Sequence, residues 1–250
     1  MTGYDGEGTI PCGTTGDKIR RYSERVYGRR SLIRFFGHGA ILTVFNCFPT
    51  VAGCLLRAAL YRLLLGSVGR GCYLEKNLRF FRPGRLFLAE RVFLGENSFF
   101  DVGHDQDAIR IGADSHISRN VTMRTQAGEI SVGRQVNIGS GSFIYSFGGI
   151  EIGDFCLIAN QVELLSADHR IDRLDIPMRF QGRTLDRIVI GPDVYLGTHC
   201  VVLGGVKIGH GAVIGAGAVV TRDIPDFAVA VGVPARVIRT RSEKRKDSDQ

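Results

Sequence analysis

Aliphatic residues recur every six positions through the last third of the chain. A period of six fits neither an α-helix, with about 3.6 residues per turn, nor a plain strand, with about 2. It is typical of a hexapeptide repeat, in which each unit is a short strand plus a corner and three units form one triangular coil of a parallel β-helix. We expect the aliphatic residue to point inward, and the glycine that often follows it to turn the corner. The series is Ile190, Leu196, Val202, Ile208, Ile214 and Val220, and the residues four positions after each are Val194, Cys200, Val206, Ala212, Ala218 and Ile224.

Earlier coils repeat the pattern with longer spacing. Their first inward residues, Ile111, Val132 and Ile152, lie 21 and 20 positions apart. Each coil is therefore predicted to have eighteen residues plus two or three more at one corner. The β-helix is predicted over 68–228. It begins irregularly, and the period breaks again at a polar loop, 166–187. A long insertion in a solenoid is a candidate functional element.

The N-terminal region has a different character. Residues 1–17 are predicted to be flexible, 18–66 helical, and 229–250 a C-terminal extension with a basic tail. Pro49 is expected to split the helical region into short helices. Two roles remain open for 18–66, namely a cap over the open end of the β-helix and a membrane-associating segment flanked by arginines. The second helix has an apolar stripe with Arg57 and Arg62 off it, made of Val51, Leu55, Leu56, Ala59, Leu60, Leu63 and Leu64.

The composition indicates which classes of binding partner to expect. The chain has 250 residues and a formal net charge of +7, which favours anionic ligands or lipid. No nucleic-acid-binding motif accompanies the basic runs, so no nucleic-acid partner is expected. The six cysteines lack CxxC spacing, and the N-terminus does not resemble a signal peptide. These features predict free thiols and a cytoplasmic protein, with peripheral contact at the inner face of the membrane as an option for 18–66.

His169 is the candidate catalytic residue, because it lies at the root of the long loop. An imidazole, with a pKa of about 6.5, can take a proton from a hydroxyl near neutral pH. A β-helix has flat faces and no internal pocket, so a site is expected at a loop, a coil edge or a neighbouring subunit. No histidines have the spacing of metal ligands, so no metal is expected. Arg222, Arg236 and Arg239 could hold a pyrophosphate.

The chain resembles the hexapeptide-repeat acyltransferases, specifically the maltose/galactoside acetyltransferase-like group, and within it the sugar O-acetyltransferases of bacterial surface polysaccharide synthesis. The resemblance covers about residues 68–240. It is carried by Ala167-Asp168-His169, Gln181-Gly182, the segments 190–199, 204–209 and 214–225, and Gly232-Val233-Pro234-Ala235-Arg236-Val237-Ile238-Arg239.

The resemblance implies a left-handed β-helix, a homotrimer and acetyl-CoA as co-substrate. It implies that His169 is the general base and that Thr198 and Ala216 line the CoA arm. Thr221 and Arg222 would contact that arm further along, and Arg236 and Arg239 would face the CoA phosphates.

Two departures from the group bear on the acceptor. Tyr195 replaces a usual Trp, and the sugar-contacting Asn of the maltose and galactoside enzymes has no clear equivalent. These changes argue against a free disaccharide.

The predicted function is acetyl-CoA-dependent O-acetylation of a sugar hydroxyl on a polysaccharide or glycolipid precursor. The alternatives are an acetyltransferase for another small acceptor (serine or an amino sugar), a non-catalytic β-helix scaffold, and a zinc hydratase.

Overall fold

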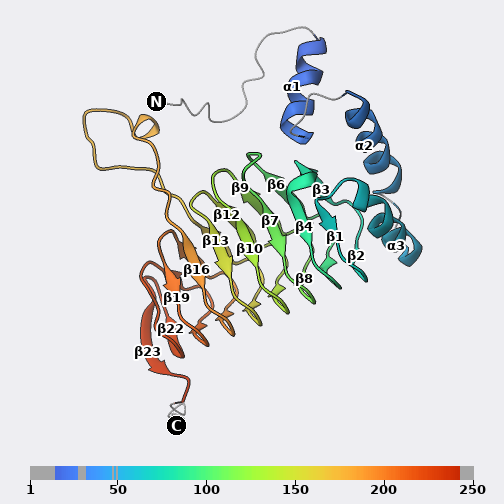
Figure 1. Ribbon diagram of the computed structural model, residues 1–250. Helices are drawn as coiled ribbons and strands as arrows, with labels where there is room; N and C mark the ends of the chain where they lie inside the picture. The colour runs from blue at the N-terminus through green and yellow to red at the C-terminus, as the bar shows by residue number, and fades with distance from the viewer. Residues whose placement is uncertain (1–14, 28–31, 47, 49, 243–250) are drawn as a thin grey trace.

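The computed structural model describes residues 15–27, 32–46, 48 and 50–242. In this part of the chain a helical segment precedes a solenoid of parallel strands (Figure 1). Among the described residues, no helix combines the length and apolar character needed to cross a bilayer. The helical segment consists of α1 (Thr15–Tyr27), α2 (Leu32–Phe45), α3 (Val51–Leu60) and the 3-10 turn η1 (Tyr61–Leu63).

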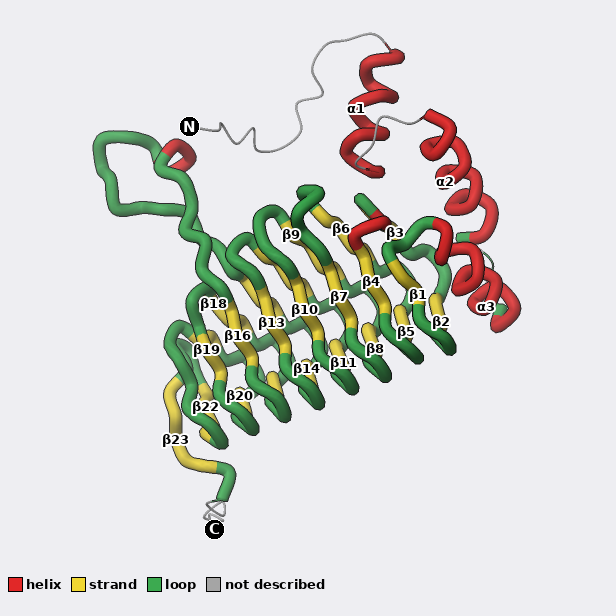
Figure 2. The backbone as a smooth tube through the Cα atoms, in the orientation of Figure 1, coloured by secondary structure: helices red, strands yellow, loops and turns green. Residues whose placement is uncertain are grey.

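Three sheets run along the solenoid (Figure 2), and from β1 to β18 each strand pairs with the strand three positions further along the chain. The first sheet contains β1 (Ser67–Val68), β4 (Leu86–Leu88), β7 (Ile109–Ile111), β10 (Ile130–Val132), β13 (Ile150–Ile152), β16 (Ile188–Ile190) and β19 (Lys207–Ile208). The second contains β2 (Tyr73–Leu74), β5 (Phe93–Leu94), β8 (His116–Ile117), β11 (Asn137–Ile138), β14 (Leu157–Ile158), β17 (Tyr195–Leu196), β20 (Val213–Ile214), β22 (Ala228–Val231) and β23 (Arg236–Thr240). The third contains β3 (Arg79–Phe81), β6 (Phe99–Val102), β9 (Thr122–Thr125), β12 (Phe143–Ser146), β15 (Glu163–Leu165), β18 (Val201–Leu203) and β21 (Val219–Val220). Two further 3-10 turns are η2 (Pro83–Arg85) and η3 (Met178–Phe180).

The pairing register confirms the predicted coil length. Ile130 pairs with Ile109 on one side and with Ile150 on the other, so these coils have 21 and 20 residues. Beyond the loop, Val189 pairs with Lys207, and the coil has eighteen residues. All twelve repeating residues of the last third are at most 5% exposed. The parallel β-helix predicted from the six-residue period is therefore confirmed.

The glycine after each inward aliphatic residue has a different role from the one expected. A Cβ on Gly197 would lie 2.5 Å from the backbone nitrogen of Ala216, and one on Gly209 would lie 2.5 Å from that of Asp226. Both atoms belong to the next coil. The left-handed residues of the corners come two positions later, at Asp193 (φ 55°) and His199 (φ 59°). Glycine is required because successive coils approach closely, and the change of direction falls elsewhere.

The helix α3 is turned the opposite way from the sequence prediction. Arg57, assigned to the polar face, is fully buried. Its Nε donates to the carbonyl of Leu74 at 2.9 Å, and Nη1 donates to the carbonyls of Phe45 and Phe48 at 3.1 and 2.7 Å. The guanidinium thus satisfies backbone oxygens where α2 ends and the first coil begins. Most of the predicted apolar stripe is exposed as a consequence.

The C-terminal end departs from the solenoid in two steps. β22 still pairs in parallel with β20, with Val229 opposite Val213. The chain then turns, and β23 runs antiparallel to β22. Arg239 therefore lies opposite Val229 at the end of the β-helix.

Candidate active site

The loop 166–187 leaves the β-helix on a short two-stranded stem that carries His169. His169 and Arg183 form an antiparallel bridge. The carbonyl of Asp168 accepts a hydrogen bond from the backbone N–H of Thr184 at 2.9 Å, and the N–H of Arg170 donates to the carbonyl of Gly182 at 3.1 Å. The imidazole is exposed, while its backbone is held on both sides. The structure therefore presents His169 to the surface from a fixed root.

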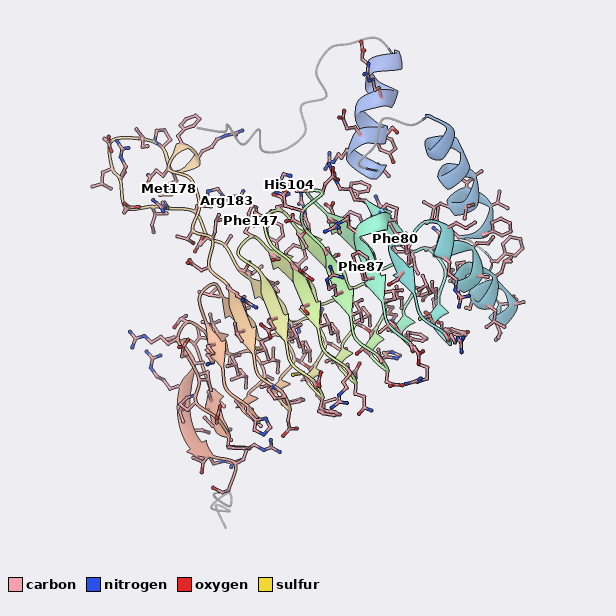
Figure 3. All side chains as sticks on the ribbon, viewed as in Figure 1. Phe80, Phe87, His104, Phe147, Met178 and Arg183 are labelled. Atoms are coloured by element: carbon pink, nitrogen blue, oxygen red, sulfur yellow. The ribbon has the colours of Figure 1, made fainter. Side chains whose placement is uncertain are left out.

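Three side chains that the sequence did not single out anchor this stem. Ser166 is fully buried, and its Oγ accepts hydrogen bonds from the N–H groups of Phe147 and Gly148 at 2.7 and 3.2 Å. The central carbon of the Arg183 guanidinium lies 4.8 Å from the centre of the Phe147 ring. Figure 3 shows Arg183 and Phe147 together at the base of the loop, with Met178 on the loop itself. No sequence motif marks these residues, because they contact one another only when the coils are stacked.

Thr198 and Ala216 lie at the edge between the second and third sheets. They occupy the corner positions that follow β17 and β20. The N–H of Gly217 donates to the carbonyl of Thr198 at 2.8 Å, which fixes the two corners one above the other. Ala216 is exposed and Thr198 is half-buried. The structure thus brings this predicted pair together.

Thr221 and Arg222 lie at the opposite edge of the third sheet, where the loop also leaves. Leu165 pairs with Leu203, and Val202 pairs with Val220. Thr221 therefore lies two coils away from the root of the loop, toward the C-terminal end. At about 4.8 Å per coil this separation is about 10 Å. Both residues are exposed.

Arg236 and Arg239 lie on β23, beyond the last coil. The N–H of Ala235 donates to the carbonyl of Val219 at 2.8 Å, which joins the start of β23 to the third sheet. Arg236 is exposed and Arg239 is half-buried. Arg236 therefore lies near the end of the third sheet, whereas Arg239 lies further along β23, opposite Val229 in the second sheet.

An apolar strip separates the two edges of this sheet. The outward side chains of β15, β18 and β21 include Leu165, Val201, Leu203 and Val219, all half-buried, with the exposed Glu163 at one border of the strip. A strip of this kind suits the uncharged part of a long ligand. Within the described residues, no three His, Cys, Asp or Glu side chains gather closely enough to hold a metal ion.

The repeat pattern matches known protein families. Residues 187–222 match the family described as bacterial transferase hexapeptide (six repeats), and residues 129–164 match the hexapeptide repeat of succinyl-transferase. These two segments therefore carry hexapeptide repeats, as the six-residue period predicted, and the resemblance to the hexapeptide-repeat acyltransferases is confirmed.

Its curated relatives carry acetyltransferase names. It is 37% identical over 150 residues to the "Probable acetyltransferase Rv3034c" of Mycobacterium tuberculosis, an alignment that covers 60% of this chain and 50% of the relative. It is 43% identical over 98 residues to the galactoside O-acetyltransferase of Escherichia coli, an alignment that covers 39% of this chain and 47% of the relative. The chain spans about half the length of these relatives.

Solved structures share the fold. The polySia specific acetyltransferase NeuO aligns with a TM-score of 0.56 at 24% identity, over 74% of this chain and 82% of NeuO. A mutant of the Bacillus cereus N-acyltransferase AntD, in complex with dTDP and coenzyme A, aligns with a TM-score of 0.55 at 22% identity. That alignment covers 73% of this chain and 88% of AntD.

Proposed function

We propose that this protein is an acetyl-CoA-dependent O-acetyltransferase that acts on a sugar hydroxyl of a polysaccharide or glycolipid precursor. The observation that carries the proposal is the position of His169. It lies on the braced stem of the loop that interrupts the repeat, beside the sheet whose two edges carry Thr198, Ala216, Thr221 and Arg222. The acetyltransferase names of the relatives support the same reaction type.

In this reaction His169 takes the proton of the acceptor hydroxyl while the hydroxyl oxygen attacks the thioester carbonyl. Acetyl-CoA supplies the activated acyl group, and the bond that breaks joins the carbonyl carbon to sulfur. The imidazolium then returns the proton to the departing thiolate. A backbone N–H at the coil edge would stabilise the oxyanion, and juxtaposition of the two substrates supplies much of the acceleration.

The co-substrate is proposed to lie along the C-terminal part of the third sheet. Thr198 and Ala216 would line its arm, and Thr221 and Arg222 would contact it at the opposite edge. The apolar strip formed by β15, β18 and β21 supports the placement of the uncharged arm between them. Arg236 and Arg239, at the end of the solenoid, would bind the phosphates.

We further propose a homotrimer in which each site is shared between neighbours. The loop supports this, because large apolar side chains stand uncovered on it in the single chain. Leu174 is 99% exposed, and Ile171, Met178 and Phe180 are also exposed. A neighbouring copy would cover them and close the cleft around His169.

Transfer of a labelled acetyl group from acetyl-CoA tests the function. Sugars, nucleotide sugars, lipid-linked saccharides, serine and amino sugars serve as acceptors. We expect a saccharide hydroxyl to be acetylated, and His169→Ala to lower the rate by ~10²–10⁴ with coenzyme A affinity within a few-fold. His104→Ala, an exposed histidine at the same edge of the solenoid, is the matched control and should retain the rate.

Each competing function has its own outcome. Acetylation of serine or an amino sugar alone would identify another small acceptor. Absence of coenzyme A binding would indicate a scaffold. Absence of acetyl transfer, together with a hydratase activity that a chelator removes and zinc restores, would indicate a zinc hydratase. Light scattering on the active protein tests the trimer, which a fully active monomer would contradict.

A further inference from the structure

The helix α3 buries its charge and exposes its apolar side chains. Arg57 is the one charged residue in α3, and it is fully buried. The residues exposed on α3 and beside it include Phe48 at 49%, Val51 at 63%, Leu55 at 61%, Leu56 at 41% and Leu63 at 70%. We call these five residues the outer face of α3. Exposing such a face to water is unfavourable, and clusters of this kind mark interaction sites.

The buried side of the same helix explains this orientation. Gly53, Cys54 and Arg57 lie on the side that faces the solenoid. A Cβ on Gly53 would lie 2.6 Å from the carbonyl oxygen of Phe48, so this side packs tightly. Hydrogen bonds from Arg57 to three carbonyl oxygens hold it in place. The outer face of α3 therefore cannot turn inward without breaking these bonds.

The position of α3 leaves its outer face accessible. α3 packs against β2, in the first coil, and Figure 1 shows it at the end of the solenoid opposite the C-terminus. Contacts between copies along the flat sheets would leave this end uncovered. A partner of the outer face would therefore approach the end of the solenoid and not its flat sheets.

The charge around this face identifies the partner. From Phe48 to Leu74 the sequence has arginines but no Asp or Glu. Arg62 and Arg70 are exposed on the segments that follow α3. A second copy of this end would bring like charges together, which opposes self-association. An anionic surface with an apolar interior complements both features.

From these observations we infer that the outer face of α3 docks on an anionic lipid surface and inserts shallowly. The inference adds membrane association, through named side chains, to the packing of α3 on the first coil. The inference also has a consequence that rests on the proposed function. In the third sheet β15 lies four coils from β3, so the loop root would stand about 20 Å from the first coil, on which α3 packs, and within reach of a lipid-linked saccharide.

Flotation of the full chain with vesicles tests the inference without any assay of acetyl transfer. Vesicles of phosphatidylcholine with phosphatidylglycerol are compared with phosphatidylcholine alone. We expect the protein to bind the anionic vesicles. Salt should weaken this binding without abolishing it, because salt screens the electrostatic attraction but not the insertion of apolar side chains. Leu55→Ser with Leu63→Ser should weaken binding roughly ten-fold or more.

The matched control is Val233→Ser with Ile238→Ser, two exposed apolar residues at the opposite end of the solenoid, and it should bind vesicles like the wild type. Circular dichroism of each variant establishes that it is folded. Wild-type protein that stays unbound at low salt, or a folded Leu55/Leu63 variant that binds as tightly as wild type, would overturn the inference. Concentration-dependent association that the Leu55/Leu63 variant removes, without vesicle binding, would assign the face to a second copy instead.

Discussion

The guanidinium of Arg183 lies over the ring of Phe147, 36 positions earlier in the chain, with 4.8 Å between its central carbon and the ring centre. Phe147 is 5% exposed and makes an edge contact with Tyr145, so the ring is a fixed platform. Because Arg183 is also the bridge partner of His169, this stacking ties the stem that carries His169 to the preceding coil.

We predict that Arg183→Ala lowers kcat about ten-fold and changes the KM for acetyl-CoA by less than about three-fold. A cation–π contact contributes about 0.5–2 kcal/mol, and its loss would let the stem move. Steady-state kinetics measure both constants. Arg173→Ala, at a loop arginine that pairs with Asp175, is the control and should retain kcat. Equal kcat values for the two variants would contradict a positioning role for Arg183.

We predict that Arg236→Ala and Arg239→Ala each raise the KM for acetyl-CoA roughly ten-fold, because each removes a charged donor that we propose binds phosphate. The control is Arg241→Ala. Arg241 lies just beyond β23, but its guanidinium is held by Asp193 at 2.7 Å and by the carbonyl of Gly211 at 2.9 Å. Dephospho-CoA competition separates the phosphates involved. An unchanged KM in both variants would show that these arginines do not bind the CoA phosphates and belong to a solvated basic tail.

Arg57→Met should lower the free energy of unfolding by about 3 kcal/mol. The substitution keeps an apolar stem but leaves three backbone carbonyls without their donor. Urea unfolding followed by circular dichroism measures the loss. Arg62→Met changes an exposed arginine of the same segment and should stay within about 0.5 kcal/mol of wild type. A loss no larger than that of Arg62→Met would show that the carbonyls find other donors.

Two buried thiols predict a pH dependence of stability. Burial raises the pKa of Cys156 to about 11 and that of Cys200 to about 12, from 9.0. Above about pH 9 the unfolded chain loses these protons while the folded chain keeps them. The free energy of unfolding should therefore fall with rising pH, by about 1.4 kcal/mol per pH unit for each thiol.

Urea unfolding at several pH values, compared between wild type and Cys200→Ala, isolates the contribution of one thiol. The variant should show a shallower decline, whatever its stability at neutral pH. Thiol labelling at neutral pH, read by mass spectrometry, should leave Cys156 and Cys200 unmodified in the folded protein. Identical slopes in the two proteins would exclude the thiol as the source of the decline.

The amino-acid sequence by itself determined the repeat. A residue such as Leu196 or Ile214 must leave water, and only a coil that returns every eighteen residues buries the whole series. The same pattern located the interruption at 166–187, because an insertion is visible as a break in the period. His169 could be singled out for that reason alone.

Only the tertiary structure decided the orientation of α3 and the anchoring of the stem. Hydropathy ranks side chains by their transfer from water, and it places Arg57 outside and Leu55 inside. Three carbonyl oxygens from separate segments reverse that order once they converge on the guanidinium. Arg183 and Phe147 likewise meet because the coils stack, a proximity that no local spacing encodes. The burial of the periodic aliphatic residues can be predicted from their spacing in the sequence. The polar and aromatic contacts form between residues that are distant in the sequence, and only once the coils have stacked.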